Sequence, residues 1–504
     1  MAIGVHALQY GRELALSPDS VSYLSAARHL AAGEGLVRFD GAPFLLWPPL
    51  YPWCLALLEG LGVDALANGA WLQWCVLGGT ALLAGWWVGE RTGSIARTLL
   101  VTVAVLVAKP LWHVSVFLWS EPLFNSFIVA ALFFAARLRE RGDTLSLALL
   151  ATSCAAACLT RHAGVFLVAA SALVLLLPGR HTWRERLIVT GLFGAGALLP
   201  PFLWWVRNAR LTGDWSGGRV AGGLDAIGGF ESYARTLADW VLPWSWPLEI
   251  KGPAALLLLA LFAVWAYRVA RRSETGRRAS ILACTAFVTV YSVGILGLGF
   301  VTVFNFPDHR ILSPLYAPLV VLTGMAWPAM HRLGRRRFYR EAVLAAAALG
   351  LVVWIGRSAI VTRRWVWIQL REETTLASPR WKESALAAAV AALPAAEPLY
   401  SNMPHVIYLY GHRDCLRSPR RHFFGAEERE TDDLRVFEAG MREVGVAHLA
   451  WFDLPAGSYF YGPDELPHGV SVTLERRYED GTLYRLEDVA PAATRAGRGP
   501  SPDP

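Results

Sequence analysis

Charged residues are scarce in this chain of 504 residues, and their scarcity excludes an ordinary soluble enzyme. They make up 17% of the sequence, whereas soluble domains contain about 25%. Lysine occurs only as Lys109, Lys251 and Lys382, so nearly all cations are arginines. Hydrophobic residues reach 54% and gather in runs long enough to cross a hydrocarbon core of about 30 Å. The sequence therefore predicts an α-helical polytopic membrane protein.

The short motifs that mark soluble catalytic sites are also missing. The chain contains no P-loop, no GxGxxG after a strand, no HExxH and no GxSxG. Its six cysteines form no readable disulfide framework. Cys154 and Cys158 share a helix face, but two thiols without a histidine or a second pair make a poor metal site. Any chemistry must use ionisable residues at the ends of membrane helices.

The net charge of +7 does not indicate a nucleic acid partner, because of its distribution. Residues 1–378 hold 33 Lys and Arg against 21 Asp and Glu, a net +12, while residues 379–488 hold 12 against 18, a net −6. The basic excess is confined to the hydrophobic part. We therefore interpret it as loop arginines that set the membrane topology, and not as a binding surface for a polyanion. We expect membrane lipids as partners, and no nucleic acid.

Apolar runs predict about ten spanning helices within residues 1–378. They cover residues 68–88, 98–113, 121–138, 144–160, 163–178, 186–206, 252–270, 279–301, 311–330 and 341–361. Every second connection is short and rich in arginine, and 18 of the 33 cations lie there. Short basic loops stay on the cytoplasmic side. The alternate connections, including residues 1–67 and 207–251, are therefore expected outside.

Residues 379–488 predict a small α/β domain on the external side. The stretch 399–411 is typical of a strand that leads into a helix, and 447–454 is typical of a buried strand. The segment 470–487 favours a hairpin that turns at Asp480 and Gly481. Residues 489–504 have the composition of a disordered tail.

The first 16 residues contain neither a cleavable signal peptide nor a spanning run. We therefore expect one of two arrangements. Either the helix at 68–88 inserts with its N-terminal flank translocated, or a preceding first helix is missing because the gene start is set too late.

Ionisable residues stand at the external ends of the predicted helices. Polar groups in or near the membrane are costly and are therefore functional candidates. The candidates are Asp19 in SPDSVSYLS, Glu121 in SEPLF, Arg161 in LTRHAG, Arg207 in RNARLTG, and Asp308 and Arg310 in PDHRILSP.

Several of these residues also have a purely structural explanation. Ser17 or Asp19 is suited to cap the helix that follows, and Glu121 before Pro122 complements the dipole at a helix start. Arg161 can extend to lipid headgroups. Their coincidence on one face favours chemistry in which a carboxylate takes a proton from a hydroxyl while a phosphate leaves beside arginine. That combination suits glycosyl transfer from a lipid phosphate.

The motifs resemble the GT-C class of integral-membrane glycosyltransferases, nearest to its bacterial protein mannosyltransferase, aminoarabinose transferase and lipopolysaccharide-core galacturonosyltransferase branches. They follow the family order: SPDSVSYLSAARHLAAGEGL and PPLYP in the first external loop, SEPLF in the second, TRHAG, RNARLTG, DHRILSPLYAP and YSNMPHVIYL. The resemblance implies a GT-C-like fold in the bacterial cytoplasmic (inner) membrane. It also implies a polyprenyl-phosphate-linked sugar donor, with the active site and C-terminal domain on the extracytoplasmic side.

The resemblance further implies roles for individual residues. Asp19 corresponds to the catalytic base and Glu121 to the acidic residue of the second loop. Arg161 falls where family members place a cation that meets the lipid phosphate. The implied substrate-binding residues are Arg161, Arg207, Asp308, Arg310 and Tyr51 of PPLYP. This chain departs from the family in two ways: it has no spanning helix before Asp19, and it has Ser20 where the mannosyltransferase branch has a second acid.

The predicted reaction is inverting transfer by a single displacement onto a hydroxyl of a lipid, glycan or protein acceptor. No cofactor is certain; a divalent metal that uses Glu121 stays open, although no ligand cluster of recognisable spacing exists.

Two other functions stay open. One is a transporter or lipid flippase, a class that tends to show inverted repeats and broken midplane helices. The other is a glycan ligase or polymerase that uses a diphosphate-linked donor.

Overall fold

The computed structural model describes residues 14–179, 182–213, 215, 226–242, 246–301, 307–326, 337–369, 375–394, 396–423, 426–454 and 459–489. The chain forms two compact units. The helical unit comprises Met1–Ala15 and Phe44–Arg371, and the α/β unit comprises Leu16–Pro43 and Glu372–Pro504. The predicted disordered tail lies almost entirely outside the described residues.

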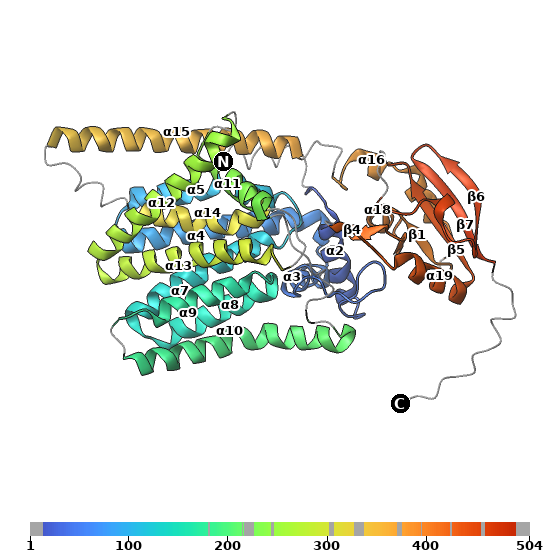
Figure 1. Ribbon diagram of the computed structural model, residues 1–504, viewed down its shortest axis with the longest axis horizontal. Helices are drawn as coiled ribbons and strands as arrows, with labels where there is room; N and C mark the ends of the chain where they lie inside the picture. Colours follow the sequence, from blue (N-terminus) through green and yellow to red (C-terminus); the bar gives the residue numbers. More distant parts are fainter. Residues whose placement is uncertain are drawn as a thin grey trace. The chain divides into compact units, whose positions relative to one another are not determined.

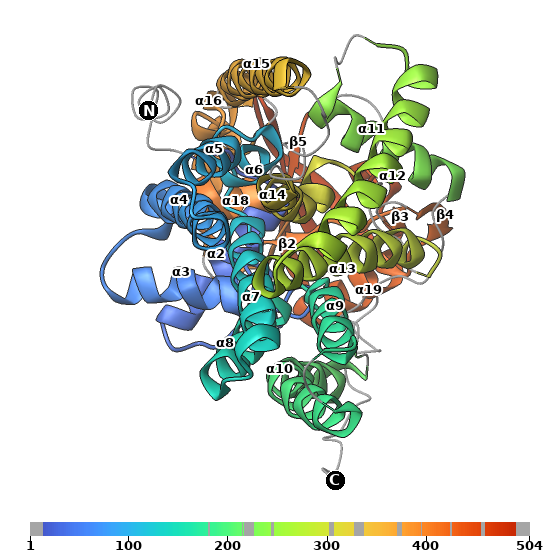
Figure 2. The same ribbon diagram turned by 90° about the vertical axis from the view of Figure 1, so that its left-hand side faces the viewer.

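The helical unit is a bundle of apolar helices that lie side by side (Figure 1). Its helices are α3 (Leu50–Gly60), α4 (Ala65–Thr92), α5 (Ile95–Leu106), α6 (Lys109–Ser115), α7 (Glu121–Arg141), α8 (Thr144–Thr160), α9 (Gly164–Leu176), α10 (Trp183–Thr212), α11 (Ala226–Val241), α12 (Leu248–Arg272), α13 (Thr275–Leu298), α14 (His309–Ala326) and α15 (Arg337–Gln369). Helical structure lies over each of the ten predicted segments. Figure 2 shows α7 at the centre of the bundle, next to α8 and α13.

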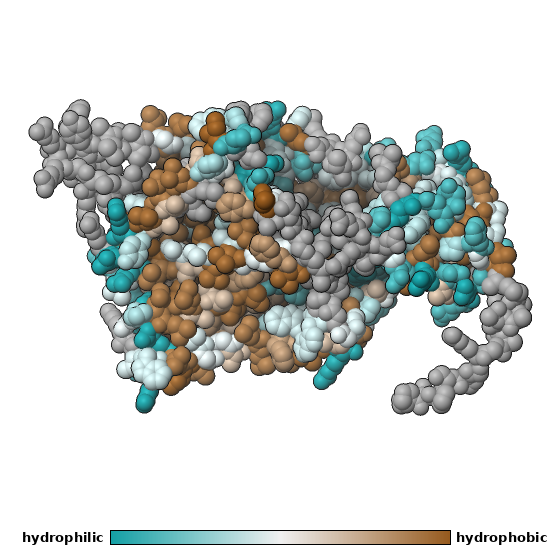
Figure 3. Space-filling view, in the orientation of Figure 1, coloured by the Kyte–Doolittle hydropathy of each residue, from teal (hydrophilic) through white to brown (hydrophobic). Residues whose placement is uncertain are grey.

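Three of the described helices, α7, α10 and α13, are long and apolar enough to cross a membrane, and the bent pair α5–α6 brings the number to as many as four. Apolar side chains cover much of the visible face of this unit (Figure 3), and many large ones are exposed, including Leu82, Trp86, Leu192 and Leu203. Such a surface is suited to lipid. The chain is therefore a multi-pass membrane protein, and the number of ten spans stays a prediction.

Short polar motifs set the ends of the bundle helices. Asp64 caps α4 by accepting from the Ala67 backbone N–H at 2.9 Å, and Asp143 caps α8 by accepting from Ser146 at 2.8 Å. At the other end of α4, Gly93 has a φ of +64°, a conformation that glycine adopts without steric cost. These caps explain why the basic connections at 93 and 142 can be so short.

The sequence predicted a single helix over 98–113, and that prediction is wrong. The chain forms α5 and α6, which meet at a bend of 50°. Pro110 in the first turn of α6 lacks an N–H donor, so it cannot continue the hydrogen-bond ladder of α5. The Val107 carbonyl instead accepts from Ser358 Oγ at 3.1 Å and Thr362 Oγ at 2.8 Å. Hydroxyl groups of α15 thus satisfy a carbonyl that the break releases.

The connection 207–251, expected as an external loop, is partly helical. Helix α10 continues to Thr212, and α11 fills residues 226–241. Tyr233, Leu237 and Trp240 of α11 are buried in the helical unit. Their spacing of three to four residues is that of an amphipathic helix, too short to have been found by a search for spanning runs.

The α/β unit is built on a five-stranded sheet. Its elements are α2 (Pro18–Ala31), α16 (Pro379–Lys382), α17 (Ala385–Val390), β1 (Leu399–Ser401), α18 (Pro404–Tyr410), β2 (Leu416–Arg417), β3 (His422–Phe423), β4 (Ala426–Glu430), α19 (Asp433–Val444), β5 (Val446–Phe452), η2 (Pro463–Glu465), β6 (Val470–Tyr478) and β7 (Gly481–Asp488). The strand order is β2-β1-β5-β7-β6; the first three are parallel, and β5, β7 and β6 pair antiparallel. The three predicted elements of this domain are confirmed, including the hairpin beside Asp480.

Residues 16–43 were grouped with the membrane helices from the sequence, but their contacts place them in the α/β unit. The Cys415 N–H donates to the Phe39 carbonyl at 3.0 Å, and the Leu376 N–H donates to Leu16 at 2.9 Å. The Phe39 ring is buried, with its centroid 4.8 Å from that of His405. Hydrogen bonds between backbone segments that are far apart in the sequence leave no pattern in the local spacing of apolar residues.

Candidate functional site

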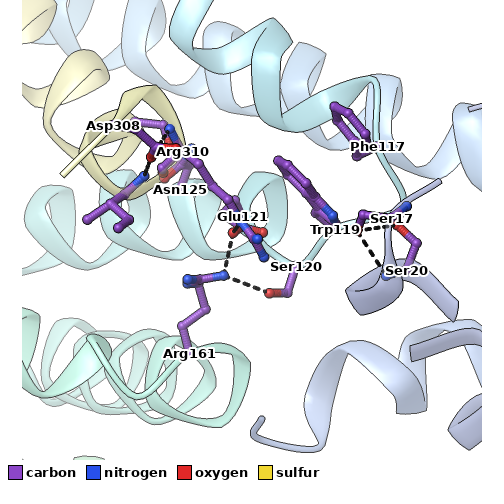
Figure 4. A network of polar contacts seen from close by, with 12 residues as sticks. Ser17, Ser20, Phe117, Trp119, Ser120, Glu121, Asn125, Arg161, Asp308 and Arg310 are labelled. Atoms are coloured by element: carbon purple, nitrogen blue, oxygen red, sulfur yellow. Dashed lines mark hydrogen bonds and ion pairs between the residues drawn. The ribbon is translucent and has the colours of Figure 1, made fainter. Parts of the chain in front are cut away.

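A buried carboxylate at the start of α7 joins two arginines from distant parts of the helical unit. The Glu121 side chain is only 1% exposed, and its Oε1 lies 2.5 Å from Arg161 Nη1. Arg310 Nε donates to the same oxygen. Figure 4 shows the two guanidinium groups converging on this carboxylate. The structure thus brings together three of the residues selected from the sequence.

The turn that carries Arg161 is held by a close helix approach. Arg161 follows the last residue of α8 with extended backbone, and its carbonyl accepts from the Gly164 N–H at 2.9 Å. A Cβ on Gly164 would lie 2.5 Å from the backbone nitrogen of Cys158. Only glycine allows α9 to begin so close to the end of α8. The TRHAG motif therefore sets the position of the Arg161 backbone.

Arg310 is placed by the cap of α14. Asp308 Oδ1 accepts from the backbone N–H groups of Arg310 and Ile311, both at 2.9 Å. Burial raises the pKa of the Asp308 carboxyl, although these two N–H groups and the Arg310 charge act against it. The Arg310 guanidinium lies 4.0 Å from the centroid of the Trp119 ring. Asp308 was selected as a substrate ligand, and its contacts here are those of a helix cap.

One oxygen of Glu121 serves both guanidinium groups. Each guanidinium has five N–H donors, and Glu121 Oε1 takes one from each, while Arg161 Nη1 also reaches Ser120 Oγ at 3.4 Å. The Arg161 side chain stays 24% exposed and that of Arg310 17%. Glu121 therefore orients two partly exposed guanidinium groups that come from distant parts of the helical unit.

A glutamine that sequence reasoning missed holds the backbone next to this cluster. Gln73 of α4 is 1% exposed, and its Nε2 donates to the carbonyls of Phe117 at 2.9 Å and Trp119 at 2.7 Å. The same amide donates to the Tyr51 hydroxyl at 2.9 Å. Tyr51, selected as a substrate ligand, is buried in this network. An amide inside an apolar run is the signal that points to Gln73.

Arg207 occupies a different place from Arg161 and Arg310. Its Nη1 donates to the Phe44 carbonyl at 3.3 Å and to Asn208 Oδ1 at 3.2 Å, and its guanidinium lies 4.6 Å from the Trp204 ring centroid. Asn208 donates to the Leu45 carbonyl at 3.2 Å. These contacts hold the segment 44–46, so Arg207 is not part of the Glu121 cluster among the described residues.

Asp19 lies in the α/β unit, in the first turn of α2. Ser17 is the cap of this helix, because the Ser20 N–H donates to Ser17 Oγ at 3.3 Å and the Ser17 N–H donates to Ser20 Oγ at 3.1 Å. Of the two capping residues considered from the sequence, Ser17 therefore takes the role. Asp19 is partly exposed, and its catalytic role stays a prediction.

A second polar group was missed although one of its members was visible in the sequence. Lys109 Nζ lies 3.2 Å from His309 Nε2, and Trp240 Nε1 donates to His309 Nδ1 at 3.1 Å. The His113 ring centroid is 6.0 Å from that of His309. A lysine within an apolar run was the available signal.

The surroundings of Glu121 do not suit a divalent cation. In the described part of the chain, no group of three or more His, Cys, Asp or Glu side chains is arranged to hold a metal ion, and the two groups that contact Glu121 Oε1 are both cations. Magnesium and calcium need several oxygen ligands. We therefore derive no step through a metal.

No protein-family model and no curated protein matches this chain by sequence. Solved structures do match its fold. ArnT from Cupriavidus metallidurans bound to undecaprenyl phosphate is similar at a TM-score of 0.61 and 14% identity, over 96% of this chain and 97% of ArnT. The archaeal oligosaccharyltransferase AglB from Archaeoglobus fulgidus is similar at a TM-score of 0.51 and 13% identity, over 87% of this chain and 66% of AglB. The chain has the GT-C fold that its motifs resemble.

Proposed function

We propose that this chain is a GT-C-type glycosyltransferase that moves a sugar from a polyprenyl-phosphate donor to an acceptor hydroxyl, with inversion at the anomeric carbon. The observation that carries the proposal is the buried Glu121 carboxylate that orients both Arg161 and Arg310. Glu121 thus holds two partly exposed guanidinium groups in one place. Such cations can form charge-assisted hydrogen bonds to a departing phosphate.

The donor class follows from this charge and from the related structures. ArnT was crystallised with undecaprenyl phosphate and AglB with dolichol-phosphate. Both molecules are long isoprenoid chains that end in a phosphate. We infer that Arg161 and Arg310 contact the donor phosphate here, and that Glu121 acts by holding them in place. Arg207, Asp308 and Tyr51 then support the site through the segments that they fix.

The reaction proceeds by one displacement. Asp19 takes the proton of the acceptor hydroxyl, whose oxygen attacks the anomeric carbon from the face opposite the phosphate. The new bond joins that oxygen to the anomeric carbon, and the bond from this carbon to the phosphate oxygen breaks. The electron pair leaves with polyprenyl phosphate, and its charge meets the two guanidinium groups. The acceptor is a lipid, glycan or protein hydroxyl.

The active site is proposed to face the extracytoplasmic side of a bacterial inner membrane, because the arginine-rich connections are expected in the cytoplasm. Labelling single cysteines tests this orientation in a variant that lacks the accessible Cys54 and Cys75. An impermeant thiol reagent should label Arg477→Cys in the α/β unit but not Arg141→Cys at the end of α7. The reverse pattern would overturn the orientation.

A glycan ligase that uses a diphosphate-linked donor is the second candidate, favoured by the similarity to the oligosaccharyltransferase AglB. The reconstituted protein can be incubated with a panel of polyprenyl-phosphate sugars and, in parallel, with polyprenyl-diphosphate glycans. Release of polyprenyl phosphate supports the first proposal, and release of polyprenyl diphosphate supports the ligase. Lipid movement across the bilayer without release of either product would instead indicate a flippase.

A further inference from the structure

The edge of the α/β sheet carries an arginine without a partner. Arg417 ends β2, the first strand in the order β2-β1-β5-β7-β6. Its side chain is partly buried. In the described part of the chain, no hydrogen bond or ion pair reaches its guanidinium. A partly buried guanidinium that has no partner among the described residues can bind an anion through its N–H donors.

The two arginines nearest to this charge are already paired. Arg38 donates to both carboxylate oxygens of Asp40, and Arg420 donates through Nε and Nη2 to Asp433 at 2.5 and 3.1 Å. Each pair is electrically neutral. Arg417 therefore remains as a net positive charge between two neutral pairs.

The neighbourhood makes that charge still less favourable. The Cys415 N–H donates to Phe39, which places Arg38 beside the start of β2. Burial first, and then the positive charges of Arg420 and Arg38, lower the pKa of Arg417, while the Asp40 carboxylate and Tyr459 act against them. Burial and the charges of Arg417 and Arg38 also lower the pKa of His405 to about 3. His405 is therefore neutral near pH 7 and adds no further positive charge at this edge.

Topology makes this edge a suitable place for a ligand. In the parallel part of the sheet, Ser401 at the carboxyl end of β1 pairs with Arg417 on one side and Ala450 on the other. The chain leaves β1 for β2 and later returns to β5 on the opposite side of β1. Ligands in such sheets bind outside the carboxyl ends of the strands, where the connections diverge. The next residue, Ser418, has a buried hydroxyl with no hydrogen-bond partner among the described residues.

We propose that this edge is a binding subsite for a phosphate group, held by Arg417. The surrounding domain is acidic, with 12 Lys and Arg against 18 Asp and Glu in residues 379–488. Diffuse attraction of anions to the domain is therefore weak, and binding must be local. A guanidinium matches a phosphate through parallel N–H donors. The phosphate is either free or the headgroup of a lipid. The subsite does not depend on the glycosyltransferase proposal.

Cys415 provides a readout confined to this unit. It is the only cysteine in residues 16–43 and 372–504, and it is 2% exposed. With the other five cysteines replaced, the rate at which a thiol reagent modifies full-length protein in detergent reports opening of the α/β unit. A ligand that binds only the closed form slows labelling by a factor of 1 + [L]/Kd. Inorganic phosphate at ten times its Kd should therefore slow labelling about 11-fold, relative to chloride at equal ionic strength.

Arg417→Gln should abolish this slowing, and Arg477→Gln should retain it. Arg477 is an exposed arginine of the same unit, so the control removes equal charge elsewhere. Without phosphate, Arg417→Gln should label no faster than the parent, because the lost charge had no partner. An unchanged rate in parent protein with phosphate, equal slowing in Arg417→Gln, or faster labelling of Arg417→Gln in chloride would each overturn the proposal.

The source of the phosphate is resolved by a second titration. Dihexanoyl phosphatidic acid is compared with inorganic phosphate, and dihexanoylglycerol serves as the uncharged control. Slowing by phosphatidic acid at concentrations where inorganic phosphate has no effect assigns the subsite to a lipid headgroup. Equal slowing by both assigns it to the phosphate group alone. Loss of glycosyl transfer in a separate assay would leave these results unchanged, so the two proposals fail independently.

Discussion

Two clusters, one in each unit of this protein, use arginine in different ways. In the α/β unit, Arg420 is matched to Asp433 through two hydrogen bonds, and Arg421 pairs with Glu465. In the helical unit, one oxygen of Glu121 serves two arginines. A matched pair has its charge balanced and stabilises local structure. A shared carboxylate orients cations without balancing them, which is how a protein prepares a site for an anion.

Burial sharpens this contrast. The Asp433 and Glu465 side chains are 27% and 41% exposed, whereas Glu121 is 1% exposed. Pairs near water are worth about 0–1 kcal/mol, and a buried pair costs about 3–5 kcal/mol to break because a charge is left unpaired. Removal of one acid should therefore have very different consequences in the two units.

The largest expected effect comes from Glu121→Gln. The amide keeps the shape but removes the negative charge that both guanidinium groups contact. We expect a loss of about 3–5 kcal/mol in stability, together with weaker donor use. Asp433→Asn in the α/β unit should cost about 1 kcal/mol or less. Thermal unfolding of both purified variants measures the difference, and equal losses would remove the distinction between shared and matched carboxylates.

The next effect concerns Asp19, in the first turn of α2. Asp19→Asn should lower turnover by about 10²-fold or more, because a general base contributes about 10² to 10⁴. The matched control is Ser17→Ala, which removes the cap of the same helix and should cost about 1 kcal/mol of stability while turnover persists. Release of polyprenyl phosphate is measured at equal amounts of inserted protein. Near-normal turnover in Asp19→Asn would exclude it as the base.

Arg161→Lys should have a smaller effect. The ammonium preserves the charge beside Glu121 but cannot present parallel donors to a phosphate. We expect a several-fold rise in the donor KM with insertion unchanged, and a further rise in Arg161→Ala. Arg420→Lys, at a matched pair of the α/β unit, is the control and should leave the donor KM unaltered. If Arg161→Lys has the donor KM of the wild type, Arg161 only anchors the turn, and Arg310 becomes the candidate that contacts the phosphate.

The smallest effect is expected at the exposed pair of Arg421 and Glu465. A hydrogen bond from Arg421 lowers the pKa of the Glu465 carboxyl below its usual value of 4.5. The carboxylate therefore stabilises the folded unit at pH values above 4.5, and this contribution is lost as the pH falls below that value. Glu465→Gln should lower the thermal midpoint by at most about 2 °C at pH 7. The difference from the parent protein should vanish near pH 3; a difference that persists there would show that the pair acts by another route.

Local patterns in the sequence were sufficient for most of the secondary structure. Apolar runs located the helices of the bundle, because an uninterrupted apolar stretch can satisfy its backbone in lipid only as a helix. Alternation and the turn beside Asp480 located the hairpin of the α/β unit. The predictions from the sequence were wrong in two segments whose local pattern was misleading. Pro110 breaks a predicted helix, and the amphipathic α11 was taken for a loop.

The composition of the candidate site depended on tertiary structure. Motifs pointed to Glu121, Arg161 and Arg310 one at a time, yet only helix packing brings Arg310 onto a carboxylate 189 residues away. The same packing separates Arg207 from them and makes Asp308 a cap. It also pairs residues 16–43 with the α/β unit and gives the Arg417 guanidinium no hydrogen bond or ion pair with the residues that the structure describes. Periodicity records which face of an element is buried, but not which distant side chain meets it there, since that depends on how the elements pack.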